Sequence, residues 1–317
     1  MSKQSNQSLV EYGNGIYALD SGYFRKEFAS IHLIVEKNIV AIVDTGTNYS
    51  VSFLLEALTS LKLNKFSVEW ILLTHVHLDH AGGAGKMMSI FPNAKLTVHK
   101  RGVRHMIDPT KLWNAVIDVY GLKEATNQYG SLIPIRPDRI VEVGEGDTIR
   151  LGNRVIEFWD APGHAKHHVF IRDSKTRCIF TGDTYGISYK ELNSNNGSFA
   201  FVSATPSQFD PVDAQNSIRR IMTSDAPSVF LTHYSRLTNI EKSGNQLLRL
   251  VNDYVEIAEK SSKKENVHSS IGTSLTELLF QNAIDHGVNL PKKVVIDLLK
   301  LDIGLNASGL VSWLDRK

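Results

Sequence analysis

The sequence predicts an α+β fold, with a mixed region of strands and helices to about residue 238 and a helical extension after it. Between residues 16 and 44, short β-branched runs are separated by turn residues, which is a hairpin signal. Residues 140–182 return to short strands with Gly, Asn, Asp and Ser in the turns. Beyond residue 238, apolar residues recur at helical spacing. We therefore expect one mixed α+β domain at 1–238 and a C-terminal helical extension at 239–317.

The first half of the chain predicts strands and helices in alternation. The run "IVAIVD" reads as a strand, and residues 48–63 place Leu54, Leu55 and Leu58 at helical spacing. A buried strand, "VEWILLT", follows at residues 68–74, and "GGAGKMMSIF" after it predicts a helix. The run "AKLTVH" predicts the next strand.

The second half predicts short strands and then helices. The runs "RVIEFWD", "HHVFI", "RCIFTG" and "SVFLTH" read as strands, and Asp210 followed by Pro211 marks a helix start. In the extension, Thr238 with Glu241 and Ser274 with Glu277 have the spacing of capping boxes. A third helix is expected to begin at Pro291 and to end at Gly304.

The composition indicates a globular protein that is not cross-linked by disulfides. The chain has 317 residues, 42% of them hydrophobic, with a net charge of +2, which is too small to indicate a nucleic-acid or membrane partner. Cys178 is the one cysteine, so an intramolecular disulfide is impossible. No apolar run approaches the roughly 18 residues of a spanning helix, and the polar N-terminal segment does not resemble a signal peptide. We expect a cytoplasmic protein.

Residues 72–83, "LLTHVHLDHAGG", concentrate metal-type side chains. In an extended chain, residues two apart point to the same side, so His75 and His77 can bind one ion together. Asp79 and His80 follow at the turn toward Gly82 and can reach a second position. Imidazole and carboxylate ligands without thiolate suit Zn, Fe, Mn or Co.

Three further candidates each follow an apolar strand. His164 comes after "RVIEFW", Asp183 after "RCIF" and His233 after "SVF". Taken singly, they could equally be a loop histidine, a turn aspartate and a hydrogen-bonded core histidine. Because all three repeat one strand-then-ligand pattern, we interpret them as metal ligands.

With these motifs, "THVHLDHAGG", "APGH", "TGD" and "LTH", the chain resembles the metallo-β-lactamase-fold hydrolases over about residues 14–238. The resemblance implies a four-layer αββα sandwich with metal ions at the rim between two sheets. It places His75, His77 and His164 on a first metal and Asp79, His80 and His233 on a second. Asp183 would bridge both. Zinc is the expected metal, with iron or manganese as alternatives.

Two details of the motifs narrow the resemblance. The bridging position is Asp183 rather than cysteine, which resembles the dinuclear hydrolase and lactonase branches. His77 stands where the flavo-diiron oxygen reductases carry an acid, which argues against that branch. The extension at 239–317 resembles the C-terminal helices of the subgroup that includes the quinolone-signal response thioesterase. Such helices would cover the metal cleft, or they would form a dimer contact.

The expected reaction is hydrolysis of a small ester, thioester or lactone. A metal pair of this kind holds a bridging water and lowers its pKa toward about 7, so that hydroxide forms at neutral pH. Asp79 is a candidate proton carrier, and Tyr185 is a candidate hydrogen-bond donor to a substrate carbonyl; a packed tyrosine is the competing interpretation of Tyr185. His168 is either a residue that orients a ligand or the first residue of a strand.

Three alternatives remain open at this point. The same metal pair can hydrolyse phosphodiesters, and a mononuclear iron site of this ligand type can oxidise a sulfur substrate. A regulatory ligand-binding protein with a residual metal site is the third. Substrate choice would depend on residues 101–138, residues 185–208 and the C-terminal helices. The patterns in these segments do not indicate a particular substrate.

Overall fold

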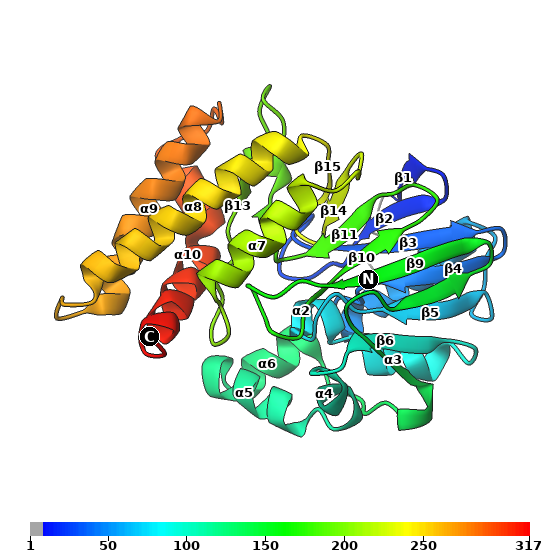
Figure 1. The fold of residues 1–317 in the computed structure, drawn as a ribbon. Helices are drawn as coiled ribbons and strands as arrows, with labels where there is room; N and C mark the ends of the chain where they lie inside the picture. The colour runs from blue at the N-terminus through cyan, green and yellow to red at the C-terminus, as the bar shows by residue number, and fades with distance from the viewer. Residues whose placement is uncertain (1–8) are drawn as a thin grey trace, which may run out of the picture. The chain divides into compact units, whose positions relative to one another are not determined.

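The protein, as a computed structural model, divides into two compact units (Figure 1). The structure describes residues 9–317, apart from the side chains of residues 119 and 120, so part of the segment used in the signal-peptide argument lies outside it. Unit 1 comprises residues 1–160 and 169–180, and unit 2 comprises residues 161–168 and 181–317. The expected domains at 1–238 and 239–317 remain a prediction. The helices of the extension belong to unit 2.

Unit 1 is built on a sheet that has seven strands among the described residues, in the order β1-β2-β3-β4-β5-β6-β7. The strands β1 to β4 pair antiparallel, and β4 to β7 pair parallel. Parallel neighbours need a crossover connection, which helices supply here. The strands are β1 (Val10–Gly13), β2 (Ile16–Asp20), β3 (Ser30–Glu36), β4 (Ile39–Val43), β5 (Val68–Leu72), β6 (Lys95–His99) and β7 (Ile140–Val143).

The helices of unit 1 lie in those crossovers. The helix α1 joins β4 to β5, α2 and α3 join β5 to β6, and α4 to α6 join β6 to β7. A hydrophobic core forms where Leu54, Leu58 and Met87 meet Leu33 and Ile42 of the sheet, as the helical spacing of residues 48–63 predicts. The helices are α1 (Val51–Ser60), α2 (Leu78–Ala81), α3 (Ala84–Ile90), α4 (Val103–Ile107), α5 (Thr110–Tyr120) and α6 (Leu122–Tyr129), with 3₁₀ turns at Asn48–Ser50 and Pro137–Arg139.

The second sheet has the strand order β15-β14-β11-β10-β9-β8, and neighbouring strands from β8 to β11 pair antiparallel. The boundary between the units passes through β11, because Ile179 and Phe180 belong to unit 1 and Thr181 and Gly182 to unit 2. The strands are β8 (Thr148–Leu151), β9 (Arg154–Asp160), β10 (Val169–Asp173), β11 (Ile179–Gly182), β14 (Val229–Leu231) and β15 (Ser235–Leu237).

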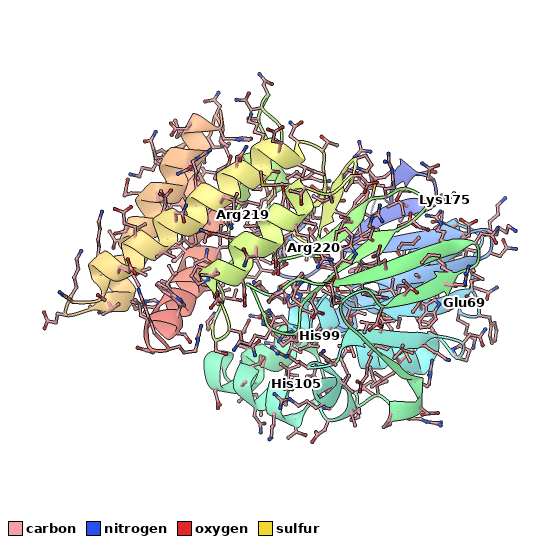
Figure 2. The ribbon with its side chains drawn as sticks, in the orientation of Figure 1. Glu69, His99, His105, Lys175, Arg219 and Arg220 are labelled. Atoms are coloured by element: carbon pink, nitrogen blue, oxygen red, sulfur yellow. The ribbon has the colours of Figure 1, made fainter. Side chains whose placement is uncertain are left out.

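A buried arginine ties the two sheets together within unit 1. Arg154, at the start of β9, is 1% exposed. Its guanidinium donates to Glu36 Oε2 at 2.8 Å and to Asp173 Oδ2 at 2.9 Å, and to the carbonyls of Val35 and Asn14. Lys175, in the turn after β10 (Figure 2), adds a 3.0 Å ion pair to Glu36. Because Arg154 and Asp173 are buried, neither charge can turn to water if the other is removed.

Unit 2 carries the remaining helices, with α7 packed on α8 and α8 to α10 packed on one another. Asp210 caps α7 by accepting from the backbone N–H groups of Val212 and Asp213, and Pro211 is its first residue, as predicted. A small two-stranded sheet pairs β12 with β13. The elements are β12 (Ile187–Ser188), a 3₁₀ turn (Lys190–Leu192), β13 (Ala200–Phe201), α7 (Pro211–Met222), α8 (Ile240–Ser261), α9 (Val267–Asp285) and α10 (Lys292–Leu314).

Some helix ends of the extension differ from the prediction. The helix α9 begins at Val267 with Asn266 as its cap, so the predicted box at Ser274 is wrong and that residue lies inside the helix. The helix α10 continues through Gly304 to Leu314, because burial of one face outweighs the low helix propensity of a single glycine. Asn239, not Thr238, precedes α8. None of the helices that the structure describes has the length and apolar character needed to cross a membrane.

Candidate metal centre

The "THVHLDH" segment leaves the end of β5 and turns into the short helix α2. His77 is the extended residue that precedes α2, so Asp79 and His80 fall in the first helical turn. His75 and His80 are fully buried, whereas His77 and Asp79 are partly exposed. The backbone therefore brings these four side chains together at one end of the sheet of unit 1, as the residue spacing predicts.

One ring nitrogen of His75 lies close to one ring nitrogen of His77. His75 Nε2 lies 3.0 Å from His77 Nδ1, and His75 Nδ1 lies 3.1 Å from the hydroxyl of Thr74. Two nitrogens on one tetrahedral zinc, each at about 2.0–2.1 Å from it, lie roughly 3.3 Å apart. The pair thus has the spacing of two ligands of a single ion.

His80 is oriented by a carboxylate that the sequence did not single out. Asp44, at the end of β4, is 1% exposed and its Oδ2 lies 2.9 Å from His80 Nδ1. The same carboxylate accepts from the backbone N–H of Thr74 at 2.9 Å and from its hydroxyl. With Nδ1 held in this way, Nε2 is the nitrogen available for a metal; it lies 3.6 Å from Asp79 Oδ2. Asp44 follows the strand run "IVAIV", so the strand-end pattern offered a signal for it.

In unit 2, Asp183 lies between two imidazoles. Its Oδ2 is 3.8 Å from His164 Nε2, and its Oδ1 is 3.8 Å from His233 Nε2. All three side chains are buried. One carboxylate that faces a different imidazole with each oxygen has the form of a bridging ligand.

Further hydrogen bonds orient these residues of unit 2. His164 Nδ1 lies 3.0 Å from the carbonyl of Ser203, which can only accept, so Nδ1 carries the proton and Nε2 has the lone pair. His168 Nε2 accepts from the backbone N–H of Asp183 at 3.2 Å. His168 precedes β10, which begins at Val169, and its contact is with the chain that carries Asp183.

Tyr185 directs its hydroxyl toward the beginning of α8. The hydroxyl donates to the carbonyl of Ile240 at 2.7 Å and lies 3.3 Å from Ser243 Oγ. The side chain is fully buried, and burial raises the pKa of Tyr185 to about 12. Donation to a substrate stays a prediction, and the hydroxyl would have to leave Ile240 to perform it.

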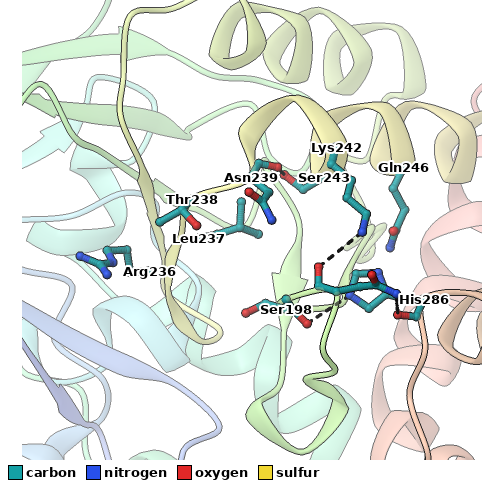
Figure 3. Close-up of a pocket in the computed structure, with 11 residues that line it drawn as sticks. Ser198, Arg236, Leu237, Thr238, Asn239, Lys242, Ser243, Gln246 and His286 are labelled. Atoms are coloured by element: carbon teal, nitrogen blue, oxygen red, sulfur yellow. Dashed lines mark hydrogen bonds between the residues drawn. The ribbon is translucent and has the colours of Figure 1, made fainter.

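A cavity of about 100 Å³ lies beside this part of α8 (Figure 3). Ser243, Lys242, Gln246 and His286 line it, with residues 196–198 and 236–239. None of the predicted metal ligands is among its lining residues, so the cavity is separate from them.

Other histidines of unit 1 have different surroundings. His99, at the end of β6, lies 3.4 Å from Asp160 Oδ1, and His105 belongs to α4 (Figure 2). Burial lowers the pKa of both imidazoles. Neither belongs to the ligand pattern.

Two sheets with helices, and imidazole and carboxylate side chains at strand ends, define an α+β protein with a candidate metal centre. The chain belongs to the metallo-beta-lactamase superfamily, whose family model matches residues 25–233. This confirms the resemblance seen in the motifs and the predicted fold class. The C-terminal helices after residue 239 agree with the predicted extension.

Individual relatives are distant. A metallo-beta-lactamase fold-containing protein of Sulfurisphaera tokodaii, ST1585, is 26% identical over 180 residues, covering 54% of this chain and 63% of its own. The crystal structure of ST1585 superposes over 94% of this chain and 99% of its own, with a TM-score of 0.65 and 21% identity. This likeness supports the fold alone.

Some of the relatives carry functional names. A hydroxyacylglutathione hydrolase of Francisella tularensis subsp. novicida is 29% identical over 121 residues, which is 38% of this chain and 35% of that protein. The acyl-coenzyme A thioesterase MBLAC2 of Gallus gallus is 28% identical over 122 residues, covering 35% of this chain and 39% of its own. The matches thus span less than two thirds of the length of these curated relatives.

Proposed function

We propose that this protein is a dinuclear metal-dependent hydrolase of small esters, thioesters or lactones. The observation that carries the proposal is Asp183, whose two carboxylate oxygens each face one imidazole at 3.8 Å. In the proposed site, Asp183 would bridge two ions. His75, His77 and His164 would hold the first ion, and Asp79, His80 and His233 would hold the second.

The donor chemistry fits divalent zinc, iron or manganese. The seven residues supply imidazole nitrogens and carboxylate oxygens without thiolate. Hydrogen bonds to Asp44 and Ser203 direct the second ring nitrogen of His80 and His164 to a ligand position. Such bonds to the far nitrogen of a ligating histidine are characteristic of protein metal sites. Zinc is our first choice.

When bound, the ions supply Lewis acidity and a water whose pKa is near 7. The chain provides the rest. The Asp44 carboxylate accepts from Nδ1 of His80 and so keeps the proton of this imidazole at Nδ1. The Ser203 carbonyl does the same for His164. Asp79, partly exposed, can carry a proton on its carboxylate to the leaving group. Asp79→Asn with full metal content and full rate would eliminate this role.

Thioesters are the substrate class that the relatives favour. The Francisella and Gallus relatives are named as a hydroxyacylglutathione hydrolase and an acyl-coenzyme A thioesterase. Both names describe cleavage of an acyl–sulfur bond. Since these matches cover little more than a third of this chain, we extend to it the bond type and not a particular acyl group.

The first test is the metal content of the purified protein. We expect about two metals per chain in the wild type and about one in His80→Ala. His105→Ala is the matched control, because this histidine lies in unit 1 outside the ligand pattern, and it should retain two. A single iron that His80→Ala leaves unchanged would contradict the hydrolase and favour sulfur oxidation.

A substrate panel separates the remaining candidates. Matched acyl thioesters, oxygen esters, lactones and phosphodiesters are assayed with the metal-replete wild type and with His80→Ala. Hydrolysis of the thioester, lost in the variant, is the expected result. Preference for phosphodiesters would replace the proposal with a phosphodiesterase, and binding without turnover of any class would indicate a regulatory protein.

A further inference from the structure

Helix α10 is hydrogen-bonded to residues 202–204, the segment that contacts His164. Asn306 of α10 is 1% exposed. Its Oδ1 accepts from the backbone N–H of Ala204 at 2.6 Å, and its Nδ2 donates to the carbonyl of Val202 at 3.1 Å. The residue between these two is Ser203, whose carbonyl lies 3.0 Å from His164 Nδ1. One side chain therefore holds the backbone on both sides of the group that orients the histidine.

The rest of α10 supports the same segment. A Cβ at Gly309 would lie 1.6 Å from the carbonyl oxygen of Ala204, so the helix backbone is in close contact with the segment. Arg316, just beyond the helix, donates to the carbonyls of Ser207 and Phe209. The Asn306 contacts are thus part of a continuous docking of α10 on residues 202–209.

We infer that Asn306 is a positioning residue for His164, and that it acts through the carbonyl of Ser203. The inference rests on the proposed function, in which His164 is a ligand of the first metal. A carboxamide is required because it offers an acceptor and a donor in one plane, like a peptide group. The two bonds to Ala204 and Val202 then fix the direction of the Ser203 carbonyl. That carbonyl in turn keeps the proton on Nδ1 of His164 and the lone pair on Nε2.

The variants for the test are Asn306→Ala, which removes both bonds and the 3.3 Å bond from Nδ2 to the Tyr254 hydroxyl, and Asn306→Asp, which keeps the acceptor and loses the donor. The matched control is Tyr189→Phe. The Tyr189 hydroxyl bonds to both carboxylate oxygens of Asp302, one turn earlier on α10, at 3.0 Å each. The control thus removes buried hydrogen bonds of the same helix without touching residues 202–204. Circular dichroism establishes that each variant is folded.

The first measurement needs no metal. Nitrogen-15 spectra of the histidine rings are recorded on chelator-treated protein, with His164→Gln used for assignment. We expect His164 to be a single Nδ1–H tautomer in the wild type and in Tyr189→Phe. In Asn306→Ala it should become a mixture of tautomers. An unchanged His164 signal in Asn306→Ala would overturn the inference; if that variant does not fold, the Asn306→Asp spectrum decides in the same way.

The second measurement is release of the two metals to a chelator. Loss of an outer partner of a metal ligand costs about 10–100-fold in affinity. Since Asn306 acts through one further group, we expect about tenfold faster release of one ion in Asn306→Ala, an intermediate value in Asn306→Asp, and no change in Tyr189→Phe. Equal release from all four proteins would overturn the role in metal binding. A wild type without metal would contradict the proposed function alone, and the tautomer measurement would still decide the inference.

Discussion

The buried Arg154 network allows a quantitative prediction for Arg154→Met. The substitution keeps the length of the side chain but leaves the buried Asp173 and Glu36 without the guanidinium, which is 2.9 and 2.8 Å from them. Removing one partner of a buried ion pair costs about 3–5 kcal/mol. Asp173 keeps its bond from the Thr176 hydroxyl at 2.7 Å, and Glu36 keeps Lys175 at 3.0 Å. We therefore expect Arg154→Met to lower the free energy of unfolding by an amount near the low end of this range, about 3 kcal/mol.

The assay is urea unfolding followed by tryptophan fluorescence, with Arg136→Met as the matched control. Arg136 pairs with Asp138 at 2.7 Å, but the two side chains are 78% and 60% exposed. An exposed pair of this kind contributes at most about 1 kcal/mol. The triple variant Arg154→Met, Glu36→Gln, Asp173→Asn should recover part of the loss, because the buried charges are gone. A loss for Arg154→Met no greater than that for Arg136→Met would refute the reasoning.

Three further predictions concern single sites. Gly309→Ala should cost about 1–3 kcal/mol in urea unfolding, because its Cβ would meet the carbonyl of Ala204. Gly304→Ala, in the same helix with nothing within 4 Å, should instead stabilise by up to about 1 kcal/mol; equal effects would contradict this. Tyr185→Phe should lose about 1 kcal/mol of stability; a tenfold loss of turnover in the stable variant would support its predicted catalytic role, and full turnover would contradict that role. Burial lowers the pKa of His32 from 6.5 to about 3. As pH falls, the His32 imidazole is therefore protonated in the unfolded chain before it is protonated in the folded protein. The free energy of unfolding should fall as pH drops from 6.5 toward 3, by up to about 1.4 kcal/mol per pH unit. His32→Gln should flatten that slope, and parallel curves would argue against it.

The sequence predicted the parts of the candidate site that depend on local pattern. His75, His77, Asp79 and His80 fall within six residues, and a strand followed by a helical turn is enough to gather them. Asp183 is likewise the residue directly after the strand β11, so its position was also predictable. Alternation of apolar and polar residues reports on burial, so the strands and most helices were predictable for the same reason.

The parts that the sequence did not predict depend on contacts between distant residues. Asp44 acquires its role through a histidine 36 positions later, and Asn306 through a segment about 100 positions earlier. The direction of the Tyr185 hydroxyl is decided by α8, 55 positions away. Gly304 remains helical because of packing. No local pattern carries such information, since a side chain's partner is chosen only when the chain folds.

The placement of Asn306 has a consequence for how the chain matures during synthesis. All seven proposed ligands have been synthesised once residue 233 is added, but the amide that holds the Ser203 segment is added 73 residues later, in α10. A nascent or truncated chain that lacks α10 would carry a full set of ligands and no fixed orientation for His164. Packing of α10 on residues 202–209 would then be a maturation step, after which the ligands that were synthesised earlier could retain their metal.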